Sequence, residues 1–242
     1  MYVPYDERLR VHPQSEGFTN HQLFDFAGTP GDNYPLLLHY PYFDLYRKQV
    51  VKQPDLVLAM MICSKSFTAE QRARNFEYYE RITVRDSSLS AATQAVVAAE
   101  VGHLDLALDY AAETALIDLR DLADNTGNGL HLAAMAGTWI ALVAGFGGLR
   151  DENRALRFAP RLPRSLTGLR FALLHRGSRL RVEIRDGEAV YTHESGEEPM
   201  TLAHHDEEFT LGPKDSATWP LPVTPLFPRP EQPPGREPRR RD

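Results

Sequence analysis

The chain has 242 residues, of which 42 % are hydrophobic and 25 % charged, a globular composition that excludes collagen, a coiled coil and wholesale disorder. No apolar run reaches the roughly 18 residues of a membrane span, and the first ten residues lack the apolar stretch of a secretory signal. We therefore expect a cytoplasmic protein without a membrane partner. The net charge of −6 argues against nucleic acid as a partner, and the single cysteine, Cys63, excludes a cysteine-based metal cluster.

Residues 1–41 are predicted to form a long ordered connection. Five prolines and three glycines interrupt any helical period there. A segment of this length without regular structure is uncommon in a compact domain. It is usually functional, or it lacks the segment against which it packs.

Two short helices follow this connection. Pro54 suits the first turn of a helix over residues 56–61. Thr68 and Gln71 have the spacing of a capping box, which predicts the start of the next helix.

Three longer helices complete the helical region. Asp86 and the serines after it offer N-cap side chains for a helix that Gly102 ends. An apolar stripe from Leu104 to Leu122 predicts an amphipathic partner helix that packs as a hairpin. Small and apolar residues on every side of the segment 130–145 predict a buried helix.

The period of the hydrophobic pattern changes to two after about residue 156. Leu180, Val182 and Ile184 alternate with charged residues, and Asp186-Gly187 is a strong hairpin turn. We expect a small antiparallel β-sheet or sandwich over 156–218. Residues 219–242 are rich in proline and end in arginines 239–241, so we expect a disordered tail.

Several blocks, in order along the chain, resemble glycoside hydrolase family 65. The blocks are KQVVKQPDLVLAM (48–60), RNFEYYE (74–80), VRDSSLSAATQAVVAAEVGHLDLALDY (84–110), GLHLAAMAGTWIALVAGFGGLRD (129–151) and FAPRLPRSLTGLRFALLHRG (158–177). The resemblance covers roughly residues 1–185. It implies an inverting enzyme that cleaves an α-linked glucose disaccharide such as trehalose, maltose or kojibiose, with water or phosphate as the nucleophile.

The resemblance also implies a barrel of six helical hairpins, an (α/α)6 toroid. Residues 1–155 supply three or four hairpins at roughly 40 residues each, too few to close the ring. We therefore expect a mainly α chain, an incomplete toroid followed by the β domain. The family's general acid lies in an Asp-Glu-Tyr-His motif upstream of the first matching block, and no Asp-Glu-Tyr triplet occurs here. The catalytic acid is thus unassigned, and an incomplete toroid would expose the apolar flanks of the helix 130–145.

The resemblance assigns two groups of binding residues. Lys52 and Gln53 match the pair that binds the hydroxyls of the cleaved glucose, although a surface lysine is the simpler interpretation of spacing alone. Ser87, Ser88 and His131 match the residues that hold phosphate in the family's phosphorylases. Without the resemblance, the simpler interpretation is that the serines cap a helix and that His131 is a core histidine. No metal or cofactor is expected, although inorganic phosphate is a possible co-substrate.

The residue at position 85 favours hydrolysis over phosphorolysis. The family's phosphorylases commonly carry His before Asp-Ser-Ser, whereas Arg85 resembles the trehalose-hydrolase-like branch. Hydrolysis needs a carboxylate base, for which Glu16, Glu80 and Asp86 are candidates. Our first hypothesis is trehalose hydrolysis, and the alternative is a phosphorylase that releases β-glucose 1-phosphate.

A third hypothesis is a split subunit or non-catalytic remnant that completes a partner's barrel. The absent acid motivates it. The expected partners are therefore an α-linked glucose disaccharide and either the remaining N-terminal part of the enzyme or a second copy of the chain.

Overall fold

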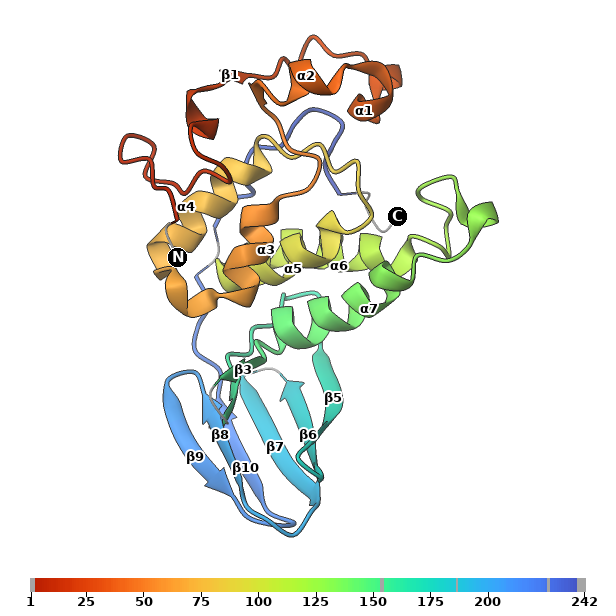
Figure 1. Ribbon diagram of the computed structural model, residues 1–242. Coiled ribbons are helices and arrows are strands. Elements are labelled where there is room, and N and C mark those ends of the chain that lie inside the picture. Colours follow the sequence, from red (N-terminus) through yellow and green to blue (C-terminus); the bar gives the residue numbers. More distant parts are fainter. Residues whose placement is uncertain (1–2, 153–154, 186, 226, 239–242) are drawn as a thin grey trace.

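The structure is a computed structural model that describes residues 3–152, 155–185, 187–225 and 227–238. A helical region lies above a β domain, and the chain then returns from the β domain to the helices (Figure 1). Within the described residues, no helix has the length and apolar character needed to cross a membrane.

The N-terminal segment is ordered but carries only short elements. These are η1 (Phe18–Asn20), β1 (Gln22–Leu23), η2 (Gly31–Asn33), α1 (Leu36–His39), α2 (Tyr42–Leu45) and β2 (Lys48–Gln49), which pairs with β1. Buried Gln49 fixes the segment because its amide donates to the carbonyl oxygen of His21 at 2.6 Å and accepts from the Tyr78 hydroxyl at 2.5 Å. The predicted long connection is confirmed.

The two short predicted helices are α3 (Asp55–Ile62) and α4 (Ala69–Glu80), separated by η3 (Ser64–Ser66). The capping box is present in full. The Gln71 N–H donates to the Thr68 hydroxyl at 3.2 Å, and the Thr68 N–H donates to the Gln71 side chain at 2.9 Å. Local sequence therefore sets the start of α4.

Helices α5 (Ser90–Glu100) and α6 (Leu104–Leu116) form the central hairpin. The predicted stripe extends too far, because α6 ends at Leu116 and Leu119 is 82 % exposed. The predicted N-cap is also wrong. Leu89 occupies that position without a side-chain cap, since the carboxylate of Asp86 accepts from the Leu36 N–H instead.

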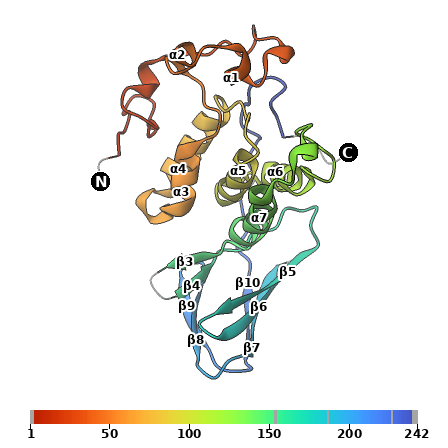
Figure 2. The same ribbon diagram turned by 45° about the vertical axis from the view of Figure 1, so that its right-hand side comes forward.

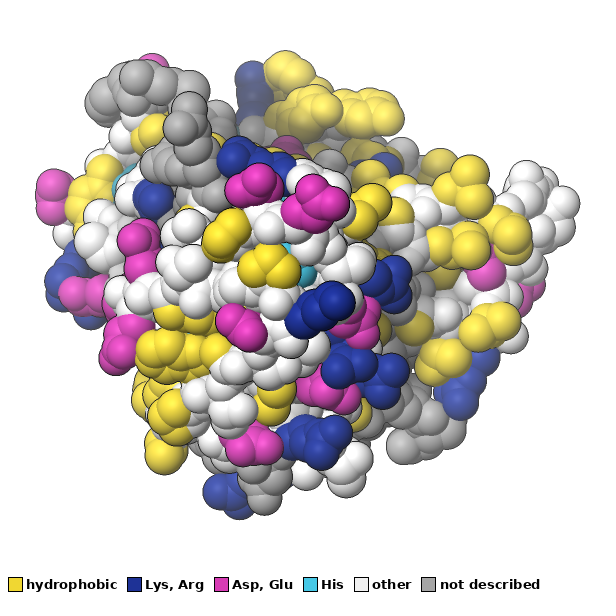
Figure 3. All heavy atoms as spheres, turned by 90° about the horizontal axis from the view of Figure 1, so that it is seen from below, with side chains coloured by type: hydrophobic (Ala, Val, Ile, Leu, Met, Phe, Trp, Pro, Cys, Tyr) yellow, Lys and Arg dark blue, Asp and Glu magenta, His cyan; other side chains and the backbone are white. Residues whose placement is uncertain are grey.

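The small-residue segment forms α7 (Leu132–Ile140) and continues into the π-helical turn η5 (Ala141–Phe146). Gly137 permits close packing on α5, since a Cβ there would lie 2.6 Å from that of Ala92. The opposite face is exposed at Leu132, Met135 and Trp139. Figure 3, which views the molecule from below, shows several groups of exposed hydrophobic side chains. The sequence predicted that this helix is buried on every side, whereas the structure leaves one face of it exposed.

The first sheet of the β domain is antiparallel, with the order β10-β7-β6-β5. Its strands are β5 (Gly168–His175), β6 (Ser178–Arg185), β7 (Glu188–Ser195) and β10 (Ser216–Pro220). Leu180, Val182 and Ile184 all point into the core, as their alternation predicts. Asp186 of the predicted turn lies outside the described residues, but β6 and β7 pair on both sides of it.

The second sheet has the order β3-β4-β8-β9. Its strands are β3 (Arg150–Glu152), β4 (Ala155–Phe158), β8 (Met200–His204) and β9 (Glu207–Leu211). β4 and β8 are parallel, so the sheet is mixed rather than antiparallel as predicted. An alternating pattern identifies a strand but carries no information about the direction of its neighbour. β3 also pairs with β4 before the expected boundary at residue 156.

Residues 221–225 and 227–238 form what we call the C-terminal strap, which runs from β10 back along the helices (Figures 1 and 2). Arg229 forms an ion pair with Asp109 on α6, and Gln232 donates to the Glu80 carboxylate at 2.9 Å. The expected disorder of 219–238 is therefore corrected, because polar pairs with the helices replace the missing apolar burial. Arginines 239–241 lie outside the described residues.

Close approach at one glycine also fixes the strap. Gly102 has a φ of 92°, and a Cβ there would lie 2.7 Å from the Pro225 carbonyl oxygen and 2.8 Å from the Phe227 ring. Gly102, which follows the end of α5, thus also leaves room for the strap to pass at close range.

We predict that Thr68→Ala lowers the free energy of unfolding by about 1 kcal/mol because α4 loses its N-cap. Thr68→Ser retains the hydroxyl acceptor and serves as the control. Chemical denaturation of the two variants and the parent measures the difference. An unchanged midpoint for Thr68→Ala would show that the capping box contributes nothing to stability.

Candidate functional site

An open pocket of about 740 Å³ lies where the turn before α5 meets the loop between α6 and α7 and the strap. Four of the five predicted binding residues line it, namely Lys52, Ser87, Ser88 and His131. The fifth, Gln53, accepts a hydrogen bond from the Ser87 hydroxyl at 3.0 Å. Residues more than 75 positions apart in sequence thus meet at one site.

Backbone pairing holds the Lys52-Gln53 turn beside the serine turn. The Val51 N–H donates to the Ile82 carbonyl at 2.9 Å, and the Val84 N–H donates to the Val51 carbonyl at 2.9 Å. Pro54 then starts α3, so the two polar residues occupy a short bend. The Lys52 side chain is exposed and, among the described residues, makes no hydrogen bond or ion pair.

Ser87 and Ser88 stand immediately before α5. The Ser87 hydroxyl accepts from the Leu89 N–H at 3.3 Å, whereas the Ser88 hydroxyl has no hydrogen-bond partner within the described part of the chain. The absence of a side-chain cap on α5 leaves the positive end of the helix open to an anion. Arg85 adopts a φ of 57°, and this bend turns the chain into the pocket.

An aspartate that the sequence did not single out orients His131. Asp118 accepts from the His131 backbone N–H at 2.8 Å and lies 2.6 Å from the ring Nδ1. This contact lowers the pKa of Asp118, so the carboxylate is charged and Nδ1–H is the donor. The contact fixes the orientation of the His131 ring at the edge of the pocket. In the sequence, Asp118 is one of several aspartates before the Asn125–Gly129 turn, and nothing there distinguishes it from the others.

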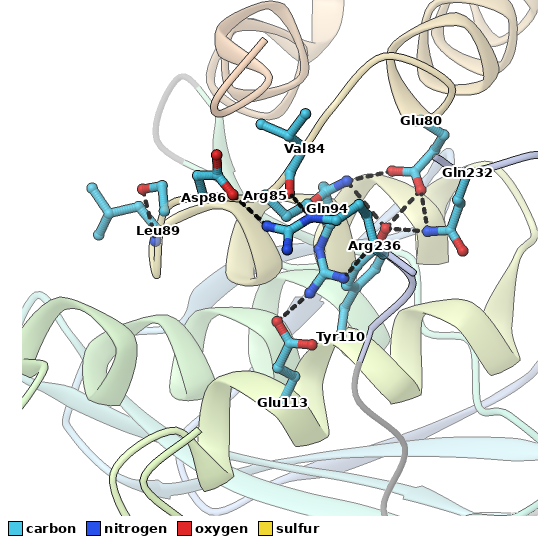
Figure 4. A network of polar contacts seen from close by, with 11 residues as sticks. Glu80, Val84, Arg85, Asp86, Leu89, Gln94, Tyr110, Glu113, Gln232 and Arg236 are labelled. Atoms are coloured by element: carbon cyan, nitrogen blue, oxygen red, sulfur yellow. Dashed lines mark hydrogen bonds and ion pairs between the residues drawn. The ribbon is translucent and has the colours of Figure 1, made fainter. Parts of the chain in front are cut away.

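Arg85 is committed to a buried network behind the pocket (Figure 4). Its guanidinium pairs with Glu113 and lies 4.9 Å over the Tyr110 ring. The Tyr110 hydroxyl donates to Glu80 at 2.6 Å, and Gln94 donates to the same carboxylate at 2.6 Å. Burial raises the pKa of Glu80, while these hydrogen bonds oppose the shift.

The strap supplies a third cation to the pocket. Arg236 pairs with Asp86, donates from Nε to the Val84 carbonyl at 2.6 Å, and lies 4.5 Å over the Tyr34 ring. Arg85 in turn donates to the Arg236 carbonyl at 2.7 Å. Sequence reasoning missed Arg236 because a proline-rich terminus gave no reason to expect contact with residues some 150 positions earlier.

The structure does not place the three candidate bases together. Glu80 lies buried in the network, Asp86 is ion-paired, and exposed Glu16 does not line the pocket. The remaining lining carboxylates are Glu113, which pairs with Arg85, and exposed Glu237. In the described ranges, no three His, Cys, Asp or Glu side chains cluster as metal ligands.

Two family models match the chain. The glycosyl hydrolase family 65 central catalytic domain matches residues 1–140, and the C-terminal domain of that family matches residues 149–211. The chain belongs to glycosyl hydrolase family 65. The resemblance inferred from the sequence blocks is confirmed.

Relatives of this family 65 chain carry more than one name. A protein of Mycobacterium leprae described as an uncharacterized glycosyl hydrolase is 54 % identical over 98 % of this chain, a match that includes the strap. An alpha,alpha-trehalose phosphorylase of Thermoanaerobacter brockii is 39 % identical over 87 % of the chain, and a kojibiose phosphorylase of Halothermothrix orenii is 35 % identical over 77 %. The chain spans 30 %, 27 % and 24 % of the lengths of these relatives.

A solved structure has the same fold. A putative kojibiose phosphorylase from the human microbiome superposes with a TM-score of 0.81 over 91 % of this chain and 30 % of its own, at 24 % identity. The partial family 65 fold is thus shown, whereas closure of a complete toroid is not tested by this chain.

We predict that Arg236→Ala destabilises the family 65 chain by about 3 kcal/mol, because it leaves the Asp86 carboxylate buried without its cation. The double variant Arg236→Ala with Asp86→Asn removes that charge and recovers part of the loss. Thermal unfolding and limited proteolysis within the strap measure both effects. Equal stability of Arg236→Ala and the parent would show that the strap is not held through this pair.

Proposed function

We propose that this chain forms the sugar- and anion-binding wall of an enzyme that cleaves an α-linked glucose disaccharide with inorganic phosphate. The observation that carries the proposal is the convergence of Lys52, Ser88 and His131 on one pocket. Lys52 and Gln53 bind hydroxyls of the cleaved glucose. Ser87, Ser88 and His131 bind the phosphate that attacks the sugar from the side opposite the leaving group.

Each wall residue has a defined chemical role in this proposal. The lysine is a point donor and the glutamine both donates and accepts, which suits a ring of hydroxyls. The serine hydroxyls and the open end of α5 bind phosphate oxygens, and the His131 ring, which Asp118 orients, adds a further polar contact. Attack with inversion releases β-glucose 1-phosphate, while a carboxylic acid outside this chain protonates the leaving sugar.

Phosphate rather than water is favoured by the state of the carboxylates. Hydrolysis with inversion needs a carboxylate free to activate water. Asp86 and Glu113 are both held by arginine, so the buried carboxylates of the pocket are neutralised. The relatives with named activities are also phosphorylases. This revises the preference for hydrolysis that Arg85 suggested, because Arg85 is occupied by Glu113.

The test uses a chimaera in which this chain follows the preceding part of the Mycobacterium leprae relative. With trehalose and phosphate, we expect β-glucose 1-phosphate as product. Ser88→Ala is expected to raise KM for phosphate about tenfold and to leave KM for the disaccharide unchanged. Lys52→Gln is expected to do the reverse.

Ser165→Ala and Lys214→Gln remove the same groups from exposed positions outside the pocket and serve as controls. Glucose release at the same rate without phosphate would contradict phosphorolysis and return hydrolysis to first place. Maltose and kojibiose, assayed in parallel, identify the preferred linkage.

The exposed face of α7 supports the proposal that the helices are part of a larger ring. Leu130, Leu132, Met135 and Trp139 are all about half or more exposed. Such a group of large apolar side chains marks a surface that meets another protein segment. We propose that the preceding part of the enzyme covers it, either in the same polypeptide or as a separate subunit.

Hydroxyl-radical footprinting of the chain alone and of the chimaera tests whether the preceding part covers this face of α7. We expect oxidation of Leu132, Met135 and Trp139 to fall severalfold in the chimaera, because burial removes the side chains from solvent. Leu174 of β5, which is 79 % exposed, is the internal control. Equal oxidation of α7 in both proteins would contradict a shared ring.

A further inference from the structure

A second pocket lies at the junction of the helices and the β domain, away from the site described above. It has a volume of about 350 Å³. Its walls come from η3, the start of α4, the end of α5, strands β3 and β4, and the turn between β8 and β9. We call it the junction pocket.

The junction pocket concentrates positive charge in a chain whose net charge is −6. Among the described residues, the carboxylates that line it are Glu100 and Asp206. The basic residues that line it, together with one histidine, are Lys65, Arg72, Arg150, Arg157, Arg161 and His205. Arginines that lie close together without a carboxylate partner repel each other unless an anion joins them.

Two of the arginines form ion pairs with these two carboxylates. Arg150 pairs with Glu100 at 2.7 Å, and Arg157 pairs with Asp206 at 3.1 Å. The second of these pairs is weak because the Asp206 side chain is 92 % exposed.

Arg72 and Arg161 are positioned by the backbone instead. Arg72 donates from one guanidinium nitrogen to the carbonyl oxygens of Ser64 at 2.8 Å and Phe67 at 2.9 Å. Arg161 donates to the Ala159 carbonyl at 2.8 Å. Among the described residues, neither guanidinium lies within ion-pair distance of a carboxylate. Carbonyl anchors fix the direction of each guanidinium and leave further N–H donors for a ligand.

The local field agrees with an anion site. Burial lowers the pKa of Arg161, and the neighbouring Arg150 and Arg72 add to the effect although Glu100 opposes it. Burial, with help from His204 and Arg161, lowers the pKa of His205 to about 4. The buried Nε2 of His205 and Nε of Arg150 have no hydrogen-bond partner. These groups gain an interaction when an oxyanion enters.

We propose that the junction pocket binds a phosphate dianion, either free or as the monoester of a small molecule. Guanidinium groups bind the tetrahedral oxygens through paired N–H donors. The volume lies at the lower end of the range for small-molecule sites, about 300–1,000 Å³. The cations converge on one pocket rather than along a stripe, which disfavours a nucleic acid backbone.

This site is independent of the proposed phosphorolysis, because it shares no residue with the pocket of Ser87 and Ser88. Its ligand would bridge the helices and the β domain, since Arg72 belongs to α4 whereas Arg150 and Arg157 belong to β3 and β4. Occupancy therefore stabilises the arrangement of the two parts.

Calorimetric titration of this chain with inorganic phosphate and with glucose 6-phosphate tests the proposal. We expect saturable binding that persists in Ser87→Ala with Ser88→Ala, so that failure of the first pocket does not affect the result. In Arg72→Gln with Arg161→Gln, the affinity is expected to fall about tenfold or more. Arg176→Gln, an exposed arginine at the turn between β5 and β6, is the control.

A second measurement needs no variant. The ring protons of His205, followed by NMR, should report a higher pKa when phosphate is saturating, because the bound anion favours the imidazolium. Tighter binding of glucose 6-phosphate than of phosphate identifies a monoester as the ligand, and equal affinity identifies the free ion. Both outcomes support the site.

Three outcomes would overturn the proposal. They are absence of saturable binding for both probes, equal affinity in the parent and in Arg72→Gln with Arg161→Gln, and an unchanged His205 pKa at saturating phosphate. Loss of binding in the chimaera would overturn it as well, since it would show that carboxylates of the preceding part already neutralise the pocket.

Discussion

Two buried arginine–carboxylate pairs hold the turn before α5, and the candidate site depends on them. Arg85 pairs with Glu113 of α6, and Arg236 of the strap pairs with Asp86. Charges removed from water are costly unless they are paired and hydrogen-bonded, so each pair restricts both partners to one arrangement. The turn is thus fixed on both sides. Ser87 and Ser88 line the same pocket as Lys52 and His131, and α5 has no side-chain cap.

The same constraint links the β domain to the site. The strap leaves β10, passes Gly102 at close range, and reaches the pocket through Arg236. Two segments far apart in sequence therefore build one wall, and the β domain contributes to the site through its continuation rather than through its sheets. Helix α5 also connects the two pockets, since its first turn follows the serines and Glu100 at its end lines the junction pocket.

Two observations support the proposal that the helices of this family 65 chain are part of a larger ring. The chain spans about 30 % of its Mycobacterium leprae relative, and α7 presents large apolar side chains where a further segment would pack. Of the carboxylates that line the pocket within the described residues, Asp86 and Glu113 are paired with arginines and Glu237 is exposed. In the function proposed above, this pocket binds sugar and phosphate, and the proton donor belongs to the preceding part of the enzyme.

The sequence by itself determined the local elements and the family. The Thr68 capping box, the alternation of Leu180 to Ile184 and the family blocks depend on neighbouring residues, so their consequences are local and were predicted correctly. The sequence also named Lys52, Ser87, Ser88 and His131, but only through resemblance. Tertiary structure alone decided that the strap is ordered, that β4 and β8 are parallel, and that Asp118, Glu113 and Arg236 support the site. These features depend on contacts between distant segments, and no period or spacing in a single sequence encodes which distant charge will neutralise another.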